Sequence, residues 1–146
     1  MRTVAEHMTA NPHTIGADQH VVTALQVMRG FGVRHLPVLD DGRLVGFLSD
    51  RELPWVGGAL DPRLRVSELM NPGPYSASPH TSLAVVARDM ADHKIEVVIV
   101  LEAGRVVGIL TVVDVARALA EVLRTEDAVH CVEPCDRFGH GVMVAR

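Results

Sequence analysis

The chain has 146 residues, of which 48% are hydrophobic and 22% charged, which is enough apolar material for one ordinary domain with a buried core. The net charge is −4, and the aromatic residues are one tryptophan, one tyrosine and three phenylalanines. A mildly acidic chain with so few stacking rings argues against nucleic-acid binding. No apolar run approaches the roughly 20 residues of a bilayer span, and the N-terminus lacks the apolar segment of a signal peptide. We therefore expect a folded, cytoplasmic protein without a membrane segment.

The sequence repeats itself after a shift of 62 residues. About a dozen of some fifty aligned positions are identical without a gap, and most others exchange one apolar residue for another. We predict two copies of one unit, at residues 1–62 and 63–124, followed by a tail at 125–146. A unit of about 60 residues buries too little surface to be stable alone, so the copies are expected to pack together and to form two equivalent clefts.

In chain order, the first copy opens with a short strand around Thr14, followed by a helix. Val21, Leu25 and Met28 recur at helical spacing, and Asp18 is a candidate N-cap for this helix. The order of elements predicted for each copy is strand, helix, strand, strand, helix.

The rest of the first copy has the pattern of a hairpin and a closing helix. Two apolar runs, 35–39 and 43–48, flank a glycine-containing turn at 40–42. A helix is expected over 50–58, where Pro54 falls early enough for its missing N–H to be tolerated.

The second copy shows the same pattern. A strand is predicted around 76–77, a helix over 83–90, a hairpin from 97–101 and 105–110, and a closing helix over 112–124. Strands and helices that alternate in this way predict a mixed α/β (α+β) fold with a pseudo-twofold axis between the copies.

Each hairpin ends in a hydroxyl residue that is followed three positions later by a carboxylate: Ser49 with Glu52, and Thr111 with Asp114. A hydroxyl at a helix N-terminus can donate to a phosphate oxygen, because unpaired N–H groups and the helix dipole attract anions there. The carboxylate, one turn along, can accept from both ribose hydroxyls. The same spacing is also close to a capping box, which needs no ligand, and the two roles are compatible.

The doubled pattern resembles a tandem pair of cystathionine-β-synthase (CBS) domains, also called a Bateman module, over residues 4–124. The segments that carry the resemblance are Val4-x-x-x-Met8, Val66-x-x-x-Met70, Leu36-Pro37-Val38, Gly46-Phe47-Leu48-Ser49-Asp50-Arg51-Glu52 and Gly108-Ile109-Leu110-Thr111-Val112-Val113-Asp114. The resemblance implies a regulatory module that binds adenosine-containing ligands, such as AMP, ADP, ATP, S-adenosylmethionine or NAD-type dinucleotides. It also implies homodimers and no catalysis.

The candidate ligand residues are grouped by copy. In the second copy, apolar residues would sandwich an adenine, and Gly108 would let the ligand approach the backbone. In the first copy, Arg51 would reach phosphates, while His35 is either part of the adenine wall or a packing residue. The full set is Thr14, Val33, His35, Pro37, Ser49, Arg51, Glu52, Ser76, Ile95, Val97, Ile99, Thr111 and Asp114. The first cleft is the more polar, so we expect a charged nucleotide there and a less charged adenosine compound in the second.

The tail carries four potential soft ligands for zinc, at His130, Cys131, Cys135 and His140. Their spacing is not a standard zinc pattern, and a redox pair or inert thiols in a docking segment are the alternatives. We assign no metal site and no required cofactor.

The sequence thus predicts a stand-alone regulatory module that binds an adenosine ligand and signals to an effector protein encoded elsewhere. Val115, Leu119 and Val122 form an apolar stripe on the last helix, which favours a homodimer. The alternative is a ligand-free dimerisation or protein-interaction module. The sequence has no nucleophile–base pair, carboxylate dyad or P-loop motif, so we do not expect an enzyme.

Overall fold

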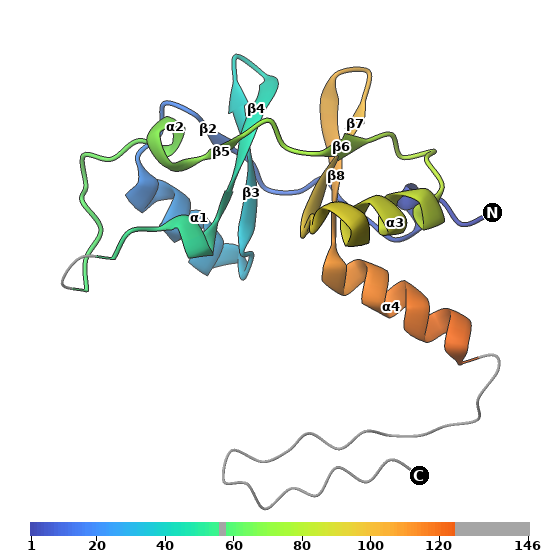
Figure 1. Cartoon of the computed structure of the whole chain (residues 1–146). Helices are drawn as coiled ribbons and strands as arrows, with labels where there is room; N and C mark the ends of the chain where they lie inside the picture. The colour runs from blue at the N-terminus through green and yellow to red at the C-terminus, as the bar shows by residue number, and fades with distance from the viewer. Residues whose placement is uncertain (56–57, 125–146) are drawn as a thin grey trace, which may run out of the picture. The chain divides into compact units, whose positions relative to one another are not determined.

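The computed structural model describes residues 1–55 and 58–124, which divide into a unit of Met1–Val115 and a second that begins at Ala116. The first unit contains two four-stranded sheets (Figure 1), and the last described helix, Val112–Leu123, continues from the first unit into the second. The helices are two short 3-10 turns, η1 (Val4–Glu6) and η2 (Asp50–Glu52), and α1 (Val21–Phe31), α2 (Val66–Leu69), α3 (Leu83–His93) and α4 (Val112–Leu123). The strands are β1 (Thr9–Ala10), β2 (Ile15–Gly16), β3 (His35–Asp40), β4 (Arg43–Ser49), β5 (Asn71–Pro72), β6 (Ser76–Ala77), β7 (Val97–Glu102) and β8 (Arg105–Thr111).

The two sheets exchange their outer strands. One sheet has the order β2-β3-β4-β5 and the other the order β1-β8-β7-β6. The hairpins β3–β4 and β7–β8 are antiparallel, and β2 and β6 each add a parallel strand. The remaining strand of each sheet comes from the leading segment of the other repeat, because β5 pairs with β4 and β1 pairs with β8. Neither repeat therefore completes a sheet alone.

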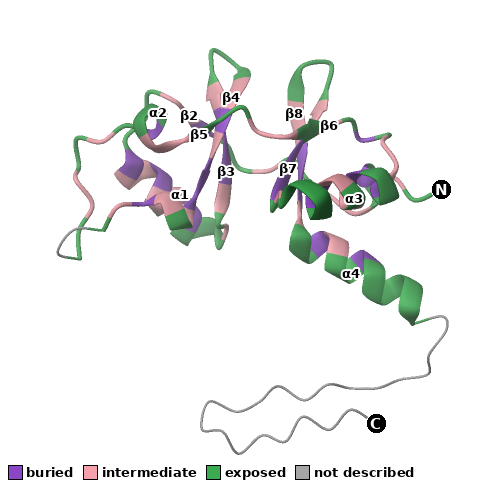
Figure 2. Ribbon diagram, in the orientation of Figure 1, coloured by how far each residue is buried: buried purple, intermediate pink, exposed green. Residues whose placement is uncertain are grey.

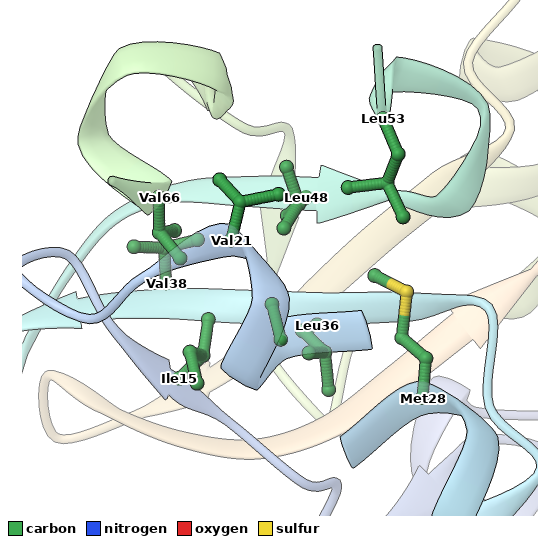
Figure 3. Packing of buried hydrophobic residues seen from close by; sticks show 9 residues of the cluster. Ile15, Val21, Met28, Leu36, Val38, Leu48, Leu53 and Val66 are labelled. Atoms are coloured by element: carbon green, nitrogen blue, oxygen red, sulfur yellow. The ribbon is translucent and has the colours of Figure 1, made fainter. Parts of the chain in front are cut away.

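A cluster of nine buried residues joins α1 to the first sheet (Figure 3). The helix contributes Val21 and Met28, as the helical spacing predicts, and β3 contributes Leu36 and Val38. Val66 from α2 enters the same cluster, so the leading segment of the second repeat is part of the first core. Burying each of these side chains stabilises the fold by about 1.5–3 kcal/mol.

A second cluster links the sheets. It is formed by Val97, Ile99 and Ile109, and Leu44 and Phe47 from β4 pack against it. Figure 2 shows buried residues concentrated along β3 and β7, as expected for strands covered on both faces. Because both faces of β3 and β7 are covered, most residues along these strands are apolar.

The closing helix predicted over 50–58 is wrong. The helical turn η2 ends at Glu52, and Leu53 is extended, with φ −74° and ψ 117°. Proline disfavours helical backbone in the residue before it and supplies no N–H for the ladder, so Pro54 stops the helix. The corresponding segment of the second repeat lacks a proline, and α4 runs from Val112 to Leu123.

Asp18 is not the N-cap of α1. The helix begins one residue after His20, whose side chain makes no capping hydrogen bond. The N–H of Val21 instead donates to the carbonyl of Leu64 at 2.8 Å, so the loop before α2 supplies an acceptor for this helix end.

Within residues 1–55 and 58–124, none of the helices combines the length and the hydropathy needed to traverse a bilayer.

Candidate functional site

The hydroxyl–carboxylate motifs form caps at both strand ends. The N–H of Ser49 donates to Glu52 Oε2 at 3.1 Å, and Ser49 Oγ accepts from the N–H of Arg51 at 3.3 Å. In the second repeat, the N–H and hydroxyl of Thr111 donate to Asp114 Oδ2 at 2.8 and 2.9 Å. The capping interpretation is thus confirmed for Ser49 and Glu52. In the second repeat, Asp114 makes the return contact to the N–H of Thr111.

A cavity of about 770 Å³ opens beside the Ser49–Glu52 turn. The ends of the first hairpin, the link from β5 to β6 and the loop from α3 to β7 all contribute to its wall. The lining residues are His35, Phe47, Ser49, Arg51, Glu52, Asn71, Gly73, Pro74, Tyr75, Ser76, Lys94, Ile95, Glu96 and Val97. Its size lies in the range of small-ligand pockets.

This cavity combines residues from both repeats. The sequence pattern predicts Ile95 and Val97 in the same cleft as Thr111, but they line the same cavity as Ser49 and Glu52. The reason is the strand exchange, since the chain passes from the first sheet at β5 to the second at β6 along the pocket wall. The predicted grouping by repeat is therefore corrected.

The other predicted residues lie elsewhere. Pro37 and Ile99 are fully buried, Ile99 within the cluster that links the sheets. Val33 packs against the first core, and Thr14 is exposed just before β2. Thr111 and Asp114 stand at the β8–α4 junction and are not among the residues that line this cavity.

The role predicted for Gly108 is wrong. The space over this glycine is filled by the thioether of Met8, so a ligand does not approach the backbone there. In the first repeat, Met70 occupies the equivalent space over Gly46. The leading Val-x-x-x-Met segments thus require glycine at these two strand positions.

Side chains of opposite charge line the pocket. Arg51 Nη1 from the first repeat donates to both carboxylate oxygens of Glu96 from the second, at 3.1 and 3.2 Å. Lys94 and Glu52 also line the wall, so the pocket carries two cationic and two anionic side chains.

Burial lowers the pKa of His35 below its usual value. The carboxylate of Asp50 opposes this shift, and the guanidinium of Arg34 adds to it. His35 therefore presents a neutral imidazole to the cavity at neutral pH.

The cavity is also lined by Tyr75, Lys94 and Glu96, which are not among the residues predicted from the sequence. Each directly adjoins a predicted residue, Ser76 or Ile95, so the pocket includes neighbours that the motifs do not mark. The Tyr75 hydroxyl donates to Asp89 of α3, and this hydrogen bond raises the pKa of Tyr75. The phenol thus stays protonated and its ring is tied to the helix.

The zinc candidates His130, Cys131, Cys135 and His140 lie outside the described residues. In the part of the chain that the structure describes, no three His, Cys, Asp or Glu side chains gather closely enough to hold a metal ion.

Comparison with protein families gives the class of the fold. The CBS domain model matches residues 4–53 and 66–121, and the chain therefore belongs to the CBS-domain family as a tandem pair. The mixed fold with two four-stranded sheets agrees with that class.

Three relatives illustrate the similarity. Hypoxic response protein 1 of Mycobacterium tuberculosis is 34% identical over 125 residues, which cover 83% of this chain and 87% of that protein. A crystal structure of CBSX2 in complex with AMP has 30% identity and a TM-score of 0.75, and covers 85% of this chain and 100% of that one. A CBS domain pair of protein MJ0100, in complex with 5′-methylthioadenosine and S-adenosyl-L-methionine, has 25% identity and a TM-score of 0.73, with coverages of 84% and 98%.

Proposed function

We propose that this CBS pair is a regulatory module that binds an adenosine-containing ligand in the cavity beside Ser49 and Glu52 and relays its occupancy to an effector protein. The observation that carries the proposal is one cavity that combines a strand-end hydroxyl and carboxylate with an apolar wall and two cations. Two solved relatives were crystallised with AMP or with S-adenosyl-L-methionine and 5′-methylthioadenosine, which favours an adenosine ligand.

Each part of the adenosine ligand has a matching group. Ile95 and Val97 offer an apolar wall for the adenine ring. The Glu52 carboxylate, fixed by the N–H of Ser49, suits the two ribose hydroxyls. Arg51 and Lys94 suit a phosphate, because a guanidinium binds phosphate oxygens through charge-assisted hydrogen bonds.

The repeats supply the means of signalling. Ser49, Arg51 and Glu52 come from one repeat, and Ile95 and Val97 from the other. A ligand that contacts both sets favours the arrangement of repeats that closes around it, because a ligand shifts an equilibrium by its differential affinity for the two states. An effector protein that binds only this arrangement of the two repeats would respond to the ligand.

The test is calorimetric titration of the full chain with AMP, ATP and S-adenosylmethionine. We expect binding of at least one ligand, and a weaker interaction with Glu52→Ala by about 1.5–3 kcal/mol, or roughly ten- to hundredfold. Glu102→Ala is the matched control, since Glu102 is an exposed carboxylate paired with His80, away from the cavity. Loss of affinity in both variants would contradict a specific role for Glu52.

A second candidate is a module whose clefts serve no ligand. It is favoured by the caps, because Glu52 and Asp114 already accept hydrogen bonds from their own strand ends. Absence of heat and of thermal stabilisation with all three ligands would support it, since any ligand specific for the native state raises stability.

A further inference from the structure

An ion pair joins Arg51 of the first repeat to Glu96 of the second, and both residues line the pocket. One guanidinium nitrogen contacts both oxygens of the carboxylate, at 3.1 and 3.2 Å. The side chains are 67% and 57% exposed. An exposed pair of this kind is weak and screened by salt, so another anion can replace Glu96 at little cost.

Both partners are anchored by their backbones. The carbonyl of Glu96 accepts from the N–H of Val112 at 3.1 Å, and the N–H of Ile95 donates to the carbonyl of Met90 at 2.9 Å. The N–H of Arg51 donates to Ser49 Oγ. The Glu96 side chain can therefore leave the guanidinium without movement of its own backbone, which lies directly before β7.

The pair has no counterpart related by the repeat. The shift of 62 residues aligns Arg51 with Val113 and Glu96 with Arg34. Valine carries no charge, and Arg34 instead pairs with Asp50 at 3.1 Å. The ion pair is thus a feature of this pocket and not of the repeated framework.

We infer that Glu96 is a specificity-determining residue of the pocket, and this rests on the proposed function. Its carboxylate holds Nη1 of Arg51, the cation that a ligand phosphate would also use. A phosphate-bearing adenosine compound competes with Glu96 for this guanidinium and meets the negative charge of its carboxylate, whereas an uncharged compound does neither. Glu96 therefore lowers the preference of the pocket for AMP over adenosine.

The experiment compares AMP with adenosine by calorimetric titration of the full chain at low and high salt. In Glu96→Gln the ratio of AMP affinity to adenosine affinity rises about two- to fivefold, the value of an exposed ion pair. The gain shrinks at high salt, because screening weakens exposed pairs. Glu102→Gln, which removes an exposed carboxylate outside the pocket, leaves the ratio unchanged.

A double variant tests whether Glu96 acts through Arg51. In an Arg51→Gln background, Glu96→Gln brings no further gain, because the guanidinium for which Glu96 competes is absent. A gain that persists in that background overturns the inference, and so does an unchanged or lower ratio in Glu96→Gln. If the wild-type chain binds AMP, either result overturns this inference alone and the proposed function stands. If neither AMP nor adenosine binds the wild-type chain, the inference and the proposed function fail together.

Discussion

Met8 fills the space over Gly108, so that a Cβ atom at position 108 would overlap the methionine sulfur. The same relationship links Met70 to Gly46 in the first repeat, where a Cβ would lie 2.8 Å from the sulfur and 2.7 Å from the carbonyl oxygen of Asn71. The repeated methionine and glycine are therefore one packing unit that holds each leading segment against a sheet.

Gly46→Ala is expected to destabilise the protein by about 1–3 kcal/mol, the usual cost of an overpacked core. The clash includes the backbone carbonyl of Asn71, which belongs to β5 and moves only if the β4–β5 pairing is disturbed. Chemical denaturation measures the change. Gly30→Ala is the control, because nothing lies within 4 Å of its added Cβ and alanine favours the helix; equal stability losses in both variants would contradict this account.

The alternation and spacing of apolar residues correctly predicted both hairpins and the helices around Val21 and Leu83. Each of these elements buries one face, so its apolar residues recur at a regular spacing in the sequence. The repeat predicts a helix after Glu52, and this prediction is wrong, because Pro54 stops the helix there.

The exchange of β1 and β5 could not be read from the sequence. Each of these strands has only two residues, and both are exposed, so they leave no hydrophobic pattern. β1 pairs with β8 at Gly108, and β5 pairs with β4 at Gly46. Both partners are distant in the sequence, so local patterns do not reveal them. The same exchange brings Ile95 and Ser49 to the wall of one cavity, although they come from different repeats. Their role in ligand binding stays a prediction.

Asp114→Ala is expected to lower the free energy of unfolding by about 1 kcal/mol, because the N–H of Thr111 loses its acceptor at the start of α4. It should also weaken any nucleotide bound in the second cleft, where the carboxylate would face the ribose. Denaturation and titration of the same variant separate the two effects. An unchanged ligand affinity with a lower melting temperature would leave Asp114 as a cap alone.

His35 gives a prediction about pH. Its pKa is lower in the folded protein than the usual value of about 6.5, so the unfolded chain takes up a proton first as the pH falls. The stability that neutral His35 contributes is complete above about pH 6.5 and declines as the pH falls toward the folded-state pKa. Melting temperatures of wild type and His35→Gln should therefore converge between pH 7.5 and 5.5, which are roughly one unit either side of that value. Parallel curves would argue against this titration.

A homodimer is expected from the apolar residues on α4. Leu119, Val122 and Leu123 are exposed on this helix, and such stripes usually pack on another surface. Multi-angle light scattering should give twice the monomer mass at micromolar concentration, and Leu119→Lys should shift the mass toward the monomer. A wild-type monomer throughout that range would refute the prediction.

The most direct test of the central claim is to map the ligand onto the backbone by amide chemical shifts. Titration with AMP should perturb the amides of Ser49, Arg51, Glu52, Ser76, Ile95 and Val97 together, because one cavity joins these segments from both repeats. The predicted result is saturable shifts at these positions, which in Glu52→Ala need about ten- to hundredfold more AMP to saturate. An absence of shifts, or saturable shifts confined to residues remote from this cavity, would contradict the account.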